Sequence, residues 1–171
     1  ALFDHEEIGS NSKKGAASIM LHDMLRRILR NMDLSENEID ESIYDAMLLS
    51  VDVAHALHPN KKEKMDITNM PVMGKGFCIK QACSQSYATD AQAIAILCQL
   101  CDEKGIPYQR FVNRSDSRGG STLGSIAGTL LPVKTVDIGI PILAMHSACE
   151  LMGVRDMKAL SDCVTAFFGY H

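Results

Sequence analysis

Apolar positions along the chain follow helical spacing in some segments and form short continuous runs in others. Between residues 13 and 32 the apolar side chains recur at helical spacing, at Ile19, Met20, Met24, Ile28 and Met32. Residues 48–53 (LLSVDV) form an apolar run with one acid near its end, which is typical of a buried parallel strand. The pattern therefore predicts a helix over residues 13–32 and a strand over residues 48–53.

Capping and stop signals define two more helices. Ser35 and Glu38 form a capping box, which predicts a second helix that runs to about residue 47. Thr89 is the expected cap of a helix over residues 90–104, and Gly105 is its expected end. A short helix is expected over residues 123–130, and a last one from residue 150 or 156 to about residue 168.

Short apolar runs between these helices predict the remaining strands, at residues 1–3, 77–80, 108–112, 133–138 and 142–145. Strands that alternate with helices indicate an α/β domain with a mixed, mostly parallel sheet flanked by helices. A length of 171 residues is enough for one domain with a substantial core.

Composition narrows the classes of protein. A net charge of -4 gives no sign of a nucleic-acid-binding surface, and no apolar run approaches the roughly 20 residues that cross a bilayer. The six cysteines lack the spacing of a small disulfide protein, so we expect free thiols and a cytoplasmic location. Cys98 and Cys101 match a C-x-x-C pattern inside a predicted helix, where packing is a better explanation than zinc binding.

Adjacent glutamates near the start of the chain are the first candidate for chemistry. Glu6 and Glu7 would point to opposite faces in a strand, so they can serve one site only where the backbone turns. A metal hydrolase needs such a pair, because one carboxylate holds the ion and the other accepts a proton from water. Taken alone, such a pair is more often part of a solvated acidic loop.

Two further groups strengthen the metal hypothesis. Asp52 and His146 each follow an apolar run, as Glu6 and Glu7 do, and ligands of α/β sheets bind beyond the carboxyl ends of strands. Carboxylate and imidazole are suitable zinc ligands. His55 lies three residues after Asp52. The sequence therefore predicts a metal site that unites separate strand ends.

A polar, glycine-rich segment at residues 113–122 is expected to be a loop whose backbone approaches a substrate closely. It lacks the Gly-Lys-Ser/Thr ending of a phosphate-binding P-loop. A serine hydrolase is disfavoured because the chain has no G-x-S-x-G motif.

Six motifs then occur in a recognisable order: residues 4–10 (DHEEIGS), 50–56 (SVDVAHA), 58–60 (HPN), 87–90 (YATD), 120–124 (GSTLG) and 137–147 (DIGIPILAMHS). In this order the chain resembles the aspartyl aminopeptidase/aminopeptidase I family of dizinc metalloaminopeptidases, over about residues 1–155. The resemblance implies the C-terminal portion of a zinc-exopeptidase catalytic domain, two zinc ions per complete site and peptide substrates. It also implies homo-oligomers, commonly dodecamers.

The resemblance assigns a role to each candidate residue. Glu6 would be the general base that deprotonates the attacking water. One zinc would be held by Glu7 and His146, and the other by Asp52. His55 would bind the substrate carbonyl oxygen. The substrate pocket would include Lys80, whose ammonium favours an acidic first residue, and Tyr87.

Some features depart from the family pattern. Ser125 stands where the family usually has proline, and Cys149 stands where it usually has arginine. The family also needs a histidine ligand, a bridging aspartate and a dimerisation domain upstream of the Glu-Glu motif. Because Ala1 is followed so soon by that motif, we expect residues 1–171 to be the C-terminal part of a longer protein.

Three functions are consistent with these features. The first is a peptidase that removes N-terminal residues, preferably acidic ones, with residues 1–171 inactive on their own. The second is a non-catalytic fragment or scaffold element that retains the fold. The third is a related dizinc carboxypeptidase or deacylase, which would not require a free α-amine on its substrate.

Overall fold

A mixed five-stranded sheet forms the centre of the computed structural model, which describes residues 1–117 and 119–170. Its four main strands lie in the order β1 (Met47–His55), β4 (Lys134–Leu143), β2 (Phe77–Gln81) and β3 (Tyr108–Val112). The β1–β4 and β2–β3 pairs are parallel, whereas β2 and the short β5 (Leu151–Met152) pair antiparallel with β4. The predicted α/β class with a mostly parallel sheet is confirmed.

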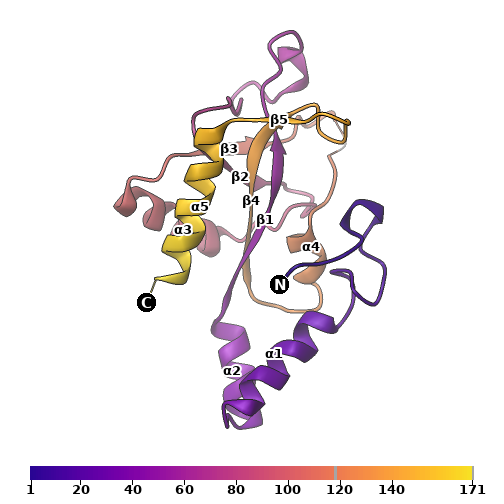
Figure 1. Ribbon diagram of the computed structural model, residues 1–171, viewed down its shortest axis with the longest axis vertical. Coiled ribbons are helices and arrows are strands. Elements are labelled where there is room, and N and C mark those ends of the chain that lie inside the picture. The colour runs from indigo at the N-terminus through magenta and orange to yellow at the C-terminus, as the bar shows by residue number, and fades with distance from the viewer. Residues whose placement is uncertain (118, 171) are drawn as a thin grey trace.

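Helices cover both faces of the sheet (Figure 1). One face packs against α3 (Ala91–Lys104) and α5 (Val154–Phe168), and the main core lies between this face of the sheet and the two helices. The other face contacts the short α4 (Leu123–Ala127). The buried side chains of the main core come from the sheet and both long helices, and they include Phe77, Leu97, Ile138 and Cys163.

Two helices extend the fold beyond the start of β1 (Figure 1). These are α1 (Met20–Asn31) and α2 (Glu36–Asp45), which pack on each other through a small apolar cluster that includes Ile39 and Ile43. Ser35 and Glu38 form the predicted capping box at the start of α2. The predicted long helix from residue 13 is shorter than expected, because residues 13–19 form turns.

Most predicted elements form close to the expected residues, but three further expectations are wrong. Residues 1–3 are not a strand, and Leu2 is 99% exposed. The cap of α3 is Asp90, whose side chain accepts the N–H groups of Gln92 and Ala93. Residues 133–138 and 142–145 do not form two strands, because one unbroken strand, β4, covers residues 134–143.

Cys101 is fully buried in the main core and Cys98 packs partly against it, as predicted for the C-x-x-C pair. None of the helices in the described ranges is both long and apolar enough to cross a membrane.

Candidate active site

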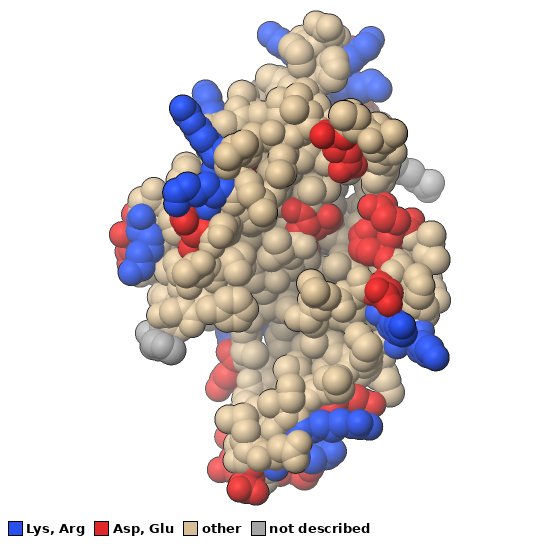
Figure 2. Space-filling view, in the orientation of Figure 1, with Lys and Arg blue, Asp and Glu red and all other residues tan. Residues whose placement is uncertain are grey.

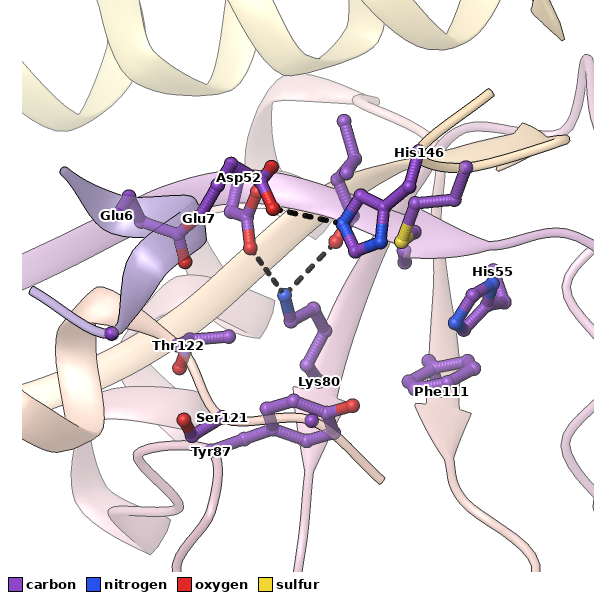
Figure 3. A pocket seen from close by; sticks show the side chains of 15 residues that line it. Glu6, Glu7, Asp52, His55, Lys80, Tyr87, Phe111, Ser121, Thr122 and His146 are labelled. Atoms are coloured by element: carbon purple, nitrogen blue, oxygen red, sulfur yellow. Dashed lines mark hydrogen bonds and ion pairs between the residues drawn. The ribbon is translucent and has the colours of Figure 1, made fainter. Parts of the chain in front are cut away.

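A cavity of about 360 Å³ opens where β1 and β4 end, beside the N-terminal segment. Its walls include every residue that the sequence nominated for a site: Glu6, Glu7, Asp52, His55, Lys80, Tyr87 and His146. Figure 3 shows that the carboxylates, Lys80 and His146 face one another, while His55 lies apart from them beside Phe111. The fold therefore unites residues that are up to 140 positions apart in the chain, from Glu6 to His146.

The two glutamates reach this cavity because they lie in a turn. They begin a 3-10 helix, η1 (Glu6–Ile8), between His5 and Gly9, which both have left-handed backbone angles (φ 64° and 96°). A strand would have sent the neighbouring side chains to opposite faces. The expectation that the backbone turns at this point is confirmed.

Glu7 and His146 form a close pair across the cavity. The Nε2 atom of His146 lies 3.0 Å from Oε2 of Glu7, and both side chains are largely exposed. His146 follows β4 with a φ of 66°, an unfavourable angle for a residue with a side chain. Glu150 supports this conformation by accepting the backbone N–H of His146 at 2.5 Å. Such a held, strained residue is typical of a functional site.

Asp52 lies inside β1, rather than at its end as the sequence suggested. Its Oδ2 atom lies 3.2 Å from the ammonium of Lys80, which also donates to the carbonyl oxygen of Val53 at 2.9 Å. Asp52 is in register with Gly139 on β4. A methyl group at Gly139 would come within 2.6 Å of the Val53 carbonyl carbon, so the absent side chain allows the two strands to approach here.

Burial and neighbouring charges shift the pKa values of several side chains that line the cavity. Burial, followed by the charges of Asp52 and Glu7, raises the pKa of Glu6 above its ordinary value. The pKa of His55 is lowered, first by partial burial of its ring and then by the charge of Lys80. His55 is therefore more often neutral near pH 7 than a free histidine. Burial also raises the pKa of Tyr87.

Aromatic rings form the wall opposite the carboxylates. The rings of Tyr87 and Phe111 lie 6.0 Å apart, and Asn113 donates to the Tyr87 hydroxyl at 3.1 Å. The Lys80 ammonium lies 4.9 Å from the centre of the Tyr87 ring. Lys80 is thus held by a carboxylate, a carbonyl oxygen and an aromatic face.

A buried acid of the quoted motifs was assigned no role from the sequence. Asp137 is fully buried in β4, and its Oδ2 atom accepts the N–H of Ala88 and, at 2.7 Å, the hydroxyl of Thr122. These contacts connect the segments that carry Tyr87 and Ser121, which both line the cavity. The sequence contains one indication of this role, namely an acid between two apolar residues at positions 136–138.

The available donors fit zinc in kind. Glu7 and His146 offer a carboxylate and an imidazole side by side, and Asp52 offers a second carboxylate in the same cavity. On the face of the molecule that Figure 2 shows, acidic side chains gather in the middle and over the N-terminal segment, whereas most basic ones lie at the margins. Within residues 1–117 and 119–170, no three histidine, cysteine or acidic side chains converge closely enough to hold an ion together. The described residues therefore offer candidate zinc ligands but no complete ligand set.

Known proteins match nearly the whole sequence. The family model described as "Aminopeptidase I zinc metalloprotease (M18)" matches residues 1–168. A probable M18 family aminopeptidase 2 of Clostridium novyi is 48% identical over 154 residues, which are 90% of this chain and 36% of that protein. A probable aspartyl aminopeptidase of Ricinus communis is 39% identical over 98% of this chain and 34% of that protein.

Solved structures agree with these matches. The chain superposes with a TM-score of 0.92 and 37% identity on a structure described as the Ape4 and Nbr1 complex, over 97% of this chain and 31% of the other. It superposes with a TM-score of 0.82 and 25% identity on the mApe1 dodecamer of S. cerevisiae, over 99% of this chain and 37% of the other. The chain thus spans about a third of the length of these relatives.

Proposed function

This chain belongs to the M18 family of zinc aminopeptidases, and from this membership we propose that the whole protein is a metalloaminopeptidase that removes N-terminal residues, preferably acidic ones, from peptides. One observation carries the proposal: Glu6, Glu7, Asp52 and His146 come from three separate parts of the fold and line one cavity. A proton acceptor beside three candidate ligands is the arrangement that a metal hydrolase requires.

Each residue has a proposed task in peptide hydrolysis. Glu6 accepts a proton from the attacking water and passes it to the leaving amine; its raised pKa brings it closer to neutral pH, which suits a general base. His55 donates a hydrogen bond to the substrate carbonyl oxygen as negative charge develops there.

Zinc is the proposed cofactor, with two ions per complete site. Glu7 and His146 would hold one ion and Asp52 the other, and bound zinc supplies an acidified water and a polarised carbonyl group. The remaining ligands are expected outside residues 1–171, which we regard as the C-terminal part of the catalytic domain. The chain's share of its relatives' length supports this division.

The proposed preference for acidic residues depends on Lys80. Among the described residues that line the cavity, Lys80 is the one with a lysine or arginine side chain. Its ammonium would attract a carboxylate on the first residue of a peptide, and Tyr87 would pack against that side chain. The printed name of the Ricinus communis relative, an aspartyl aminopeptidase, supports the same preference.

The test compares the whole protein with residues 1–171 alone. We expect the whole protein to release aspartate from an aspartyl peptide faster than alanine from the matched alanyl peptide. Prolonged dialysis against a chelator should abolish release, and added zinc should restore it. Residues 1–171 alone should bind zinc weakly and release no amino acid, because part of the ligand set is missing. Amino acid release is measured by chromatography.

Other outcomes would favour the alternatives. An N-acetylated aspartyl peptide that is cleaved as fast as the free peptide would indicate a carboxypeptidase or deacylase instead. A whole protein without hydrolytic activity would favour the scaffold alternative. Robust aspartate release by residues 1–171 would contradict their proposed inactivity.

We also propose that the protein forms homo-oligomers, or that another part of the same protein covers this chain. Along the exposed side of α1, Ile19, Met24 and Ile28 are each more than half exposed, and β1 forms one edge of the sheet. Exposed apolar surface and an open edge favour association. The dodecameric relative supports the first possibility. Sedimentation of the whole protein should show an oligomer, and a compact monomer would count against it. A cytoplasmic location stays a prediction.

A further inference from the structure

Lys80 is a buried ammonium in the middle of the proposed site. Its side chain is 3% exposed, although it carries a full charge. A buried charge is costly unless it is paired and hydrogen-bonded. Lys80 meets that requirement with Asp52 at 3.2 Å and the Val53 carbonyl oxygen at 2.9 Å (Figure 3).

The same pair also benefits Asp52. Three carboxylates line the cavity, those of Glu6, Glu7 and Asp52, and their mutual repulsion would favour displacement of one of them. Lys80 is the cation that faces Asp52 within the described part of the cavity. Its contact therefore fixes the position of this carboxylate and offsets part of the negative charge.

Asp52 thus has two possible cationic partners. The proposed function makes it a zinc ligand, while the structure gives it an ammonium as its partner. Like charges repel, so an ammonium and a divalent ion that share one carboxylate each weaken the hold of the other.

We propose that Lys80 is the resident counter-cation of Asp52, which holds this carboxylate in place before zinc binds and competes with zinc for it. This inference rests on the proposed function. Lys80 keeps two other contacts when Asp52 is shared, namely the Val53 oxygen and the Tyr87 ring at 4.9 Å. It can therefore remain in the cavity as the cation that a substrate carboxylate meets.

The proposal predicts that loss of the ammonium tightens zinc binding. In the whole protein, Lys80→Met should lower the dissociation constant for zinc about tenfold, within the usual range for coupled binding events. Without zinc, the variant should melt at a lower temperature than wild type, because Asp52 loses its partner. The rise in melting temperature on adding zinc should be larger. A chromophoric chelator that competes for zinc gives the affinity, and calorimetry gives the melting temperatures.

Matched variants separate charge from packing. Lys80→Arg keeps the positive charge and should bind zinc like wild type. Lys80→Gln keeps a hydrogen-bond donor without the charge and should bind zinc as tightly as Lys80→Met, which provides a second test if the methionine variant fails to fold. The exposed Lys75, which lies outside the cavity, gives the control Lys75→Met, with no expected change.

Two results would overturn the proposal, and they are distinguishable. If wild type binds zinc and both uncharged variants bind it equally or more weakly, Lys80 does not compete for Asp52 and only this inference fails. If wild type binds no zinc at all, the proposed function fails together with the inference.

Discussion

Replacement of Glu6 by glutamine in the whole protein is expected to lower kcat by roughly 10²–10⁴-fold, the usual contribution of a positioned general base. Glutamine has the shape of glutamate but cannot accept the proton of the attacking water. The change removes a negative charge from a cavity in which Asp52 and Glu7 repel Glu6, so the melting temperature should not fall. Steady-state hydrolysis of an aspartyl peptide at saturating zinc measures the effect.

The pH dependence of the wild-type protein offers a second view of the same residue. Because the pKa of Glu6 is raised by burial and by neighbouring carboxylates, its basic form is lost at a higher pH than for a free glutamate. In the metal-free protein, the Glu6 carboxyl should therefore titrate with a pKa above the ordinary value of 4.5, which NMR of its side-chain carbon measures. For the Glu6→Gln variant, the matched control is Glu41→Gln, which makes the same change on the exposed surface of α2 and should leave kcat unchanged. Full activity of Glu6→Gln would remove Glu6 from the mechanism.

Replacement of Asp156 by alanine is expected to destabilise the fold by about 2–5 kcal/mol, because one buried and one part-buried N–H group lose a charged acceptor. Asp156 is fully buried in the first turn of α5. Its two carboxylate oxygens accept the N–H groups of Gly74 at 2.6 Å and Gly76 at 2.7 Å. These bonds connect α5 to the turn that leads into β2.

That turn packs closely against the segment that leads into β3. Gly76 has a φ of 104°, and a methyl group there would come within 2.1 Å of the Pro107 carbonyl oxygen. Urea unfolding followed by circular dichroism measures the loss of stability. The control is Asp162→Ala on the same helix; Asp162 is more exposed and pairs with Lys158 at 2.7 Å, so its loss should cost only about 0.5 kcal/mol. An equal effect of both variants would show that the buried hydrogen bonds add nothing.

The sequence predicted correctly those helix ends and strands that depend on residues close together in the chain. The α2 capping box connects Ser35 with a residue three positions later, and it forms as expected. Gly105 ends α3 with a left-handed φ of 64°, which its missing side chain permits. The expected strand at residues 108–112 coincides with β3.

β4 shows where local signals fail. Gly139 and Pro141 lie between the two strands that the sequence predicted, yet β4 continues through both. The Ile142 carbonyl oxygen accepts the N–H of Ala56 after β1, so Pro141 turns its backbone away from β1. It falls between the pairings of β4 with β2 and with β5, where a missing N–H interrupts no ladder. That β4 can accommodate a proline at this position becomes clear only from the arrangement of its neighbouring strands.

The sequence by itself determined the family and the chemical identity of the candidate site. The identities of Glu6, Glu7, Asp52 and His146 and their order along the chain can be read from the sequence alone, and this order is specific to the family. The tertiary structure decided their partners: Lys80 for Asp52, His146 for Glu7, and the Gly74–Gly76 turn for Asp156. These contacts join residues 28 to 139 positions apart. Their distances depend on strand order and register, which no periodicity within one segment contains.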